Sequence, residues 1–146
     1  MCFADADVAE LRRRLEAEDD GFAFGWEADD QLHWEAPFIG LYPNRLTGNA
    51  IRDEDRLSDG TTPTGVGKMF VAHPDLGHSR LIERLQPHVG HHHATSSGIN
   101  FAEVPPHGAD KGTALARLCA QLDIVAEEVV AFGDNLNDLT LSLIHI

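Results

Sequence analysis

The sequence predicts an α/β fold, and three observations carry that prediction. Residues 6–18 place apolar side chains every three or four positions among charged ones, the pattern of an amphipathic helix. Residues 21–27 and 31–36 alternate apolar side chains with others, and the Ala-Asp-Asp between them favours a turn, so we expect two short strands. Residues 127–134 form an apolar strand candidate that ends in Gly-Asp and leads into another helix start.

Between these segments the expected elements are less regular. Residues 40–67 are rich in Gly, Pro, Asn, Asp and Thr, and we expect a surface loop there. The further elements that we expect are a buried strand over 68–73, a helix over 77–87, and two tightly joined strands over 91–97 and 98–104.

A break follows these strands. Pro105, Pro106 and Gly108 mark a domain boundary. Asp110 is suited to cap a helix over residues 111–122, whose Leu115, Leu118 and Leu122 share one face.

Composition limits the classes of partner. The chain has 146 residues, 42% of them hydrophobic, which is enough for a core in one domain or one and a half. Its formal net charge is −13 and its sequence pI about 4.9, so its surface should repel nucleic-acid phosphates and anionic membranes.

Cysteine usage points to a reducing compartment. Cys2 and Cys119 show no CxxC spacing, so neither a disulfide framework nor a zinc site is indicated. With no recognisable signal peptide and no apolar run of membrane-spanning length, we expect a cytoplasmic protein.

The segment after the apolar strand candidate at 127–134 carries the chemistry. Asp134, Asn137 and Asp138 fall within one turn, and ligands of open α/β sheets gather at the carboxyl ends of the strands. Two carboxylates and an amide are oxygen ligands suited to Mg²⁺. On spacing alone, a turn whose acidic residues only cap the next helix explains the pattern equally well.

A family resemblance favours the metal site. Gly-Asp-Asn-Leu-Asn-Asp (133–138) resembles the GDxxND motif of haloacid-dehalogenase (HAD) phosphatases, especially the Cof-type branch. Upstream, Gly108-Ala109-Asp110-Lys111-Gly112 resembles the lysine segment of that branch, and 22 residues separate Lys111 from Asp134, as in the family. Residues 68–71, 95–97 and 101–104 resemble strands of its cap.

The resemblance implies hydrolysis of a small phosphate monoester, such as a phosphosugar, through an aspartyl-phosphate. It implies that Lys111 is the catalytic lysine, that Asp134 and Asp138 hold Mg²⁺, and that Asn137 supports them. It further implies that residues 1–108 form a C2-type α/β cap, with a mainly antiparallel sheet and two helices to one side. Residues 109–146 would be part of a Rossmann-like core, and their apolar strand would be poorly covered.

The family's first motif, DxDGT after an apolar strand, is missing. Asp5 and Asp7 lie in a predicted helix, and Leu57 stands where the first aspartate before Asp59-Gly60-Thr61 belongs. We therefore expect a truncated phosphatase, inactive alone, with its nucleophile and its Ser/Thr motif upstream of Met1.

Two alternatives stay open. One is a transition-metal-binding module, because His91 and His93 would share a face of a strand. Its further candidate ligands are His73, His78, His88, His92 and His107. The other is a non-catalytic remnant that folds but does nothing alone.

Overall fold

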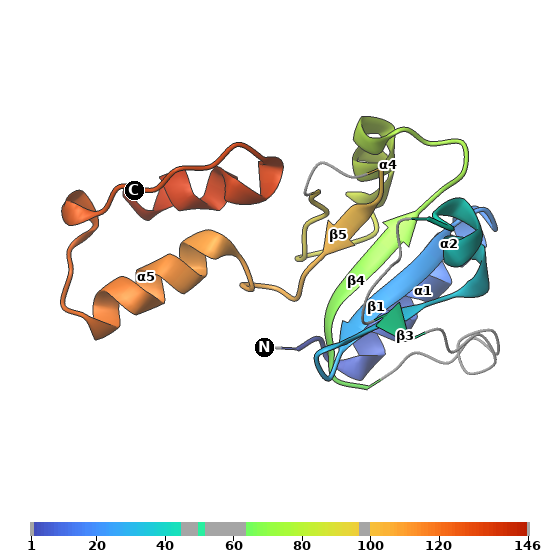
Figure 1. Cartoon of the computed structure of the whole chain (residues 1–146), viewed down its shortest axis with the longest axis horizontal. Coiled ribbons are helices and arrows are strands. Elements are labelled where there is room, and N and C mark those ends of the chain that lie inside the picture. Colours follow the sequence, from blue (N-terminus) through green and yellow to red (C-terminus); the bar gives the residue numbers. More distant parts are fainter. Residues whose placement is uncertain (1, 45–49, 52–63, 97–99, 146) are drawn as a thin grey trace.

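A five-stranded sheet forms the centre of the larger part of the molecule (Figure 1). The computed structural model describes residues 2–44, 50–51, 64–96 and 100–145. In spatial order the strands are β3 (Ala50–Ile51), β2 (Gln31–Trp34), β1 (Ala23–Ala28), β4 (Val66–Ala72) and β5 (Ala102–Val104). All neighbours pair antiparallel except β3, which runs parallel to β2. The predicted α/β fold with a mainly antiparallel sheet is confirmed.

The hairpin of β1 and β2 is built as its sequence indicates. Asp29 and Asp30 have φ angles of 50° and 59°, the left-handed pair that a tight hairpin turn needs and that aspartate tolerates. The register sets Gly25 opposite Trp34. A Cβ on Gly25 would lie 2.3 Å from Cε3 of Trp34, so only glycine leaves room for the indole.

The sheet is apolar on both faces. One face packs on the helices α1 (Asp5–Glu18) and α4 (His78–Leu85), as predicted for two helices to one side. Phe22, Phe24 and Trp26 belong to this first core, which confirms the alternation read from the sequence. The other face packs on α2 (Ala36–Leu41), where Phe38 stacks on Trp34 with ring centroids 4.9 Å apart.

A buried ion pair joins α1 to the residue that precedes α2. Nη1 of Arg12 lies 2.7 Å from Oε1 of Glu35, and Nε of Arg12 donates to Oε1 of Glu16 at 2.7 Å. The Arg12–Glu35 contact has the distance of an ion pair without the alignment of a hydrogen bond. Glu35 is 5% exposed, and burial raises its pKa to about 7 despite the opposing charge of Arg12.

The C-terminal elements stand apart from the sheet in Figure 1, beyond the connection at 105–110. They are α5 (Lys111–Gln121), the 3₁₀ turn η1 (Ala126–Glu128) and the 3₁₀ helix η2 (Leu136–His145). Asp110 caps α5, as predicted, by accepting a hydrogen bond from the Thr113 amide at 2.8 Å. The stretch predicted to be a leucine face is largely open, because Leu118 is 50% exposed.

Two predicted strands are wrong. Residues 91–93 form a turn and its exit, and only Thr95 makes a single bridge, to Glu103. Residues 129–134 are not in a strand, because a strand needs a hydrogen-bonded neighbour and none of the described residues pairs with them. As expected for this segment, its apolar side chains are poorly covered: Val130 is 78% exposed and Phe132 is 89% exposed.

The surface loop predicted over 40–67 is only partly described. Residues 45–49 and 52–63 lie outside the described parts, so Asp59 cannot be placed. The remainder is more regular than predicted, because β3 and the beginning of β4 fall within it. The short helix α2, which starts just before this stretch, was not predicted either; Pro37 in its first turn was its one local signal.

Candidate functional site

The lysine singled out by the sequence opens a helix. Lys111 is the first residue of α5, directly after its cap Asp110. Thr113 donates to Asp110 twice, from its amide and from its hydroxyl, each at 2.8 Å. Burial, which alone would raise the pKa of Asp110, is outweighed by these bonds, and the pKa lies below its ordinary value. The cap therefore fixes the backbone position from which the Lys111 side chain extends.

Lys111 and Asp138 are in contact, although 27 positions separate them in the chain. Nζ of Lys111 donates to Oδ1 of Asp138. The second carboxylate oxygen of Asp138 accepts from the amides of Asp134 and Asn135, at 3.2 Å each. The lysine, followed by these amides, holds the pKa of Asp138 below its ordinary value although burial opposes it. Asp138 is thus an ionised carboxylate at neutral pH.

Close packing of α5 on η2 brings these groups together. The Gly112 amide donates to Oγ1 of Thr140 at 3.1 Å. A Cβ on Gly112 would lie 2.2 Å from the Thr140 carbonyl oxygen, so a larger residue there would separate the helices. Gly133 packs as tightly on Asp138, with 2.2 Å between an added Cβ and Cβ of Asp138.

The other two predicted ligands lie in the same segment. The Asp134 carboxylate is exposed and accepts from Nδ2 of Asn135 at 2.8 Å. Asn137 is half-buried and lines a cavity together with Lys111. Carboxylate and amide oxygens are the donors that Mg²⁺ prefers, so the chemistry of Asp134, Asn137 and Asp138 fits that ion.

The cavity beside Lys111 lies between the sheet and the C-terminal helices. It has a volume of about 120 Å³. Its lining residues are Lys68, His93, Thr95, Glu103, Pro105, Ala109, Asp110, Lys111 and Asn137. Nζ of Lys68 lies 3.3 Å from Oε2 of Glu103, so a buried acid and a second lysine face the same space.

Sequence reasoning did not single out Lys68, Glu103 or Thr140 as site residues, and it grouped His93 with His91 rather than with Lys111. The pairing of β4 with β5 sets Phe70 opposite Glu103, which brings Lys68 near the same end of β5. That register was the missing information. For Thr140, its position two residues after the GDxxND motif was the only local signal.

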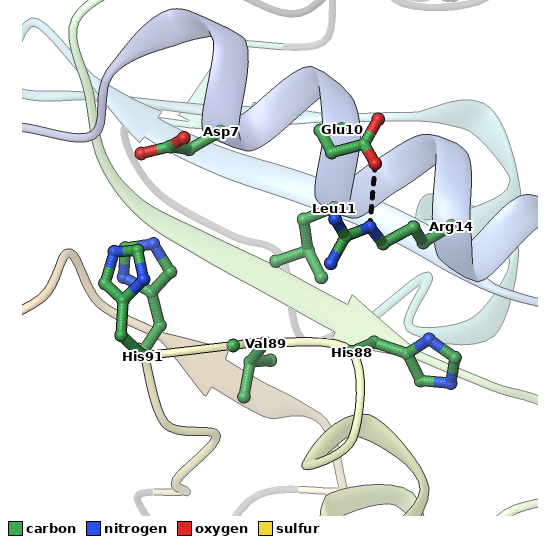
Figure 2. A pocket seen from close by; sticks show the side chains of 9 residues that line it. Asp7, Glu10, Leu11, Arg14, His88, Val89 and His91 are labelled. Carbon is green, nitrogen blue, oxygen red and sulfur yellow. Dashed lines mark hydrogen bonds and ion pairs between the residues drawn. The ribbon is translucent and has the colours of Figure 1, made fainter.

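Asp7, the second aspartate of the Asp5-Ala-Asp7 segment that was weighed against the family's DxDGT motif, lies elsewhere. It lines a different cavity, together with His88, His91 and His92 (Figure 2). The predicted pair of His91 and His93 is also separated, because His93 lines the cavity of Lys111 whereas His91 does not.

Comparisons with known proteins identify the family of this chain. Residues 26–142 match the family model described as haloacid dehalogenase-like hydrolase. The chain is 33% identical over 81 residues to the HMP-PP phosphatase of Yersinia enterocolitica, covering 55% of this chain and 30% of that protein. It is 40% identical over 67 residues to the HMP-PP phosphatase of an Enterobacter species, covering 45% of this chain and 24% of that protein.

Solved structures share the fold. A haloacid dehalogenase-like hydrolase from B. subtilis superposes with a TM-score of 0.69 at 18% identity, over 99% of this chain and 59% of that one. A HAD subclass IIB sugar phosphatase gives a TM-score of 0.69 at 14% identity, over 96% and 52%. The chain thus spans about half the length of these structures and less of the curated relatives.

Within the described residues, no helix combines the length and the apolar character needed to cross a membrane. The family match extends from β1 to η2 and includes both Lys111 and the GDxxND segment. This chain belongs to the haloacid dehalogenase-like hydrolases.

Proposed function

We propose that this chain carries the cap and the second half of the active site of a Mg²⁺-dependent phosphatase that acts on small phosphate monoesters. The contact between Lys111 and Asp138, beside a cavity that cap residues also line, is the observation that carries the proposal. We propose residues 1–108 as the cap and 109–146 as part of the core, a division that follows the break at Pro105–Gly108.

Each site residue has a task in this proposal. Lys111 presents a fixed positive charge to the phosphate oxygens, and Asp138 keeps its ammonium group in place. Asp134, Asp138 and Asn137 would hold the metal ion through oxygen atoms. When bound, Mg²⁺ offsets the negative charge on the phosphate and the attacking carboxylate.

The nucleophile is the group that the described residues do not supply. The family's reaction needs an aspartate whose carboxylate attacks phosphorus, displaces the alcohol and is then freed by water. None of the described residues puts a further aspartate in the cavity of Lys111 except its own helix cap, Asp110. We therefore propose that the described residues bind the phosphate group of the substrate but do not hydrolyse its ester bond.

Three similar proteins suggest the substrate class. The curated relatives are HMP-PP phosphatases, and one structural neighbour is a sugar phosphatase. Both names denote phosphatases, and the second names sugars as the substrates of that protein. Lys68 and Lys111 line one cavity with the acid Glu103, which suits a phosphate at one end and hydroxyl or amino groups at the other.

Hydrolysis of p-nitrophenyl phosphate in the presence of Mg²⁺ tests the proposal, with circular dichroism as the check of folding. We expect a folded chain without turnover. Turnover that Asp134→Ala abolishes would show that a nucleophile exists in this chain, and would overturn the proposed division of labour.

Metal binding gives a second readout that needs no turnover. Mn²⁺ used as a paramagnetic probe should broaden the NMR signals of amides 134–138. Asp134→Asn should remove the broadening. Asp123→Asn, an exposed aspartate after α5 that is not part of the site, should keep it. Equal broadening in both variants would refute the metal site.

A further inference from the structure

A second cluster of metal-ligating side chains lies away from Lys111, where the first turn of α1 faces residues 88–92. A cavity of about 160 Å³ separates these segments. Asp7 and His91 project toward it from facing elements (Figure 2). The HAD site does not use these residues, because they do not line the cavity of Lys111.

Three side chains converge at this cavity. One ligand atom each from Asp7, His91 and His92 lies within 4.8 Å of the others. Two ligands on one tetrahedral Zn²⁺ lie about 3.3 Å apart, given metal–ligand bonds near 2.0–2.1 Å. Asp7 and His91 are exposed, so small rotations of their side chains can close the remaining gap.

The histidine rings are already arranged as neighbours. The centroids of His91 and His92 are 4.4 Å apart, with their planes inclined by 36°. Phe3 packs on His92 from another side, at 4.7 Å between centroids, and limits the movement of this ring. His107 lies beside His91, with its Nδ1 2.9 Å from the His91 carbonyl oxygen. The His92 ring is therefore held in place, whereas the exposed His91 ring can rotate.

The Pro105 carbonyl lies beside the His92 ring, but this contact falls short of hydrogen-bond geometry. Both ring nitrogens of His92 are buried, and within the described part of the chain neither has a hydrogen-bond partner of good geometry. Buried polar side-chain atoms usually do have one, so two unpartnered nitrogens on one ring call for an explanation.

The surrounding charges permit a cation. Arg14 lines the same cavity, but its Nε donates to Oε1 of Glu10 at 2.7 Å, as the dashed line in Figure 2 marks. His88 pairs with Glu18 and is therefore not free to join the cluster. Asp7 supplies the negative charge that a divalent ion needs.

We propose that Asp7, His91 and His92 form a binding site for a divalent transition-metal ion of the Zn²⁺ class. Two imidazoles and one carboxylate are ligands that such ions prefer, whereas Mg²⁺ prefers oxygen alone. The bound ion would tie the start of α1 to the turn at 91–92. This site is independent of the proposed phosphatase site, so either can fail without the other.

The test is calorimetric titration of the full chain with Zn²⁺, after removal of any affinity tag and in excess Mg²⁺ to occupy oxygen-only sites. We expect about one strongly bound Zn²⁺ per chain. Asp7→Asn, His91→Gln and His92→Gln should each weaken binding by at least about tenfold, because even groups behind the ligands contribute that much in metal sites.

His93→Gln is the matched control, since it removes the adjacent histidine that points to the other cavity. It should retain Zn²⁺ affinity. Asp7 and His91 are exposed, so their variants test the site even if His92→Gln disturbs packing. The proposal is overturned if no strong Zn²⁺ binding occurs, or if His93→Gln weakens it as much as His91→Gln does.

Discussion

Glu35 should make this protein less stable as the pH rises from about 4.5 to about 7. Its carboxyl group is 5% exposed, and burial raises its pKa from 4.5 to about 7 in the folded chain. A folded pKa above the unfolded one means that the folded state binds more protons between the two values. The stability that this proton provides is complete below pH 4.5 and is lost as the pH passes through about 7.

The size of the effect follows from the two pKa values. They differ by about 2.5, and each unit corresponds to about 1.4 kcal/mol, so the upper limit is about 3–4 kcal/mol. Arg12 acts in the opposite direction, since its guanidinium lies 2.7 Å from Glu35 and favours the ionised carboxylate. The pH slope therefore measures whether burial or the ion pair dominates.

Urea unfolding of the wild-type chain and of Glu35→Gln, between pH 4.5 and pH 8, measures this slope. Titrating groups that do not interact with Glu35 contribute equally to both proteins and cancel in the difference of their unfolding free energies. We expect the wild-type advantage to fall by up to about 3–4 kcal/mol across this range. Glu16→Gln removes an exposed acid from the same Arg12 and should shift stability by less than about 1 kcal/mol.

A difference that stays flat with pH would refute the reasoning, and so would one that rises with pH. The second result would mean that Arg12 lowers the pKa of Glu35 more than burial raises it.

Three further predictions concern packing. Phe38→Ala should lower the free energy of unfolding in urea by about 3–5 kcal/mol. Phe132→Ser, at an 89% exposed position, should change it by no more than about 0.5 kcal/mol. Equal losses of stability in the two variants would contradict the assigned core. Gly112→Ala should speed hydrogen exchange in η2, because its Cβ meets the Thr140 carbonyl, while Gly40→Ala, with open space around it, should not. Amides of β1 and β4 should exchange more slowly than those of 129–133, and the reverse order would place the stable core in the wrong part of the chain.

The elements that the sequence predicted well are those in which local pattern and final surroundings agree. Alternation in 21–27 and 31–36 sorted side chains between the two faces of the sheet, and Asp110 marked the start of α5. The segment 129–134 has an equally clear apolar pattern, yet it is not a strand, because pairing depends on a neighbour that the pattern does not contain. The strand predicted over 91–97, which would have placed His91 and His93 on one face, is wrong for the same reason.

The site divides in the same way. Lys111 and Asp138 were predicted from motifs, and they are in contact. Lys68 and Glu103 reach the same cavity through the pairing of β4 with β5, which no local motif encodes. The cluster of Asp7 with His91 and His92 needed the fold of the turn at 91–92, since strand geometry would have paired His91 with His93 instead.

A sheet that is apolar on both faces has a problem of alignment. In a sheet with one wet face, a slip by one residue exposes the core, and that cost fixes the register. Here such a slip would only exchange one apolar face for the other. The fit of Trp34 over Gly25 distinguishes the correct register of the β1–β2 hairpin from a shifted one. A shift by one residue would set the indole against Phe24 or Trp26 instead of the one position in β1 without a side chain. Shape rather than polarity aligns these strands, so Gly25→Ala would threaten the pairing itself.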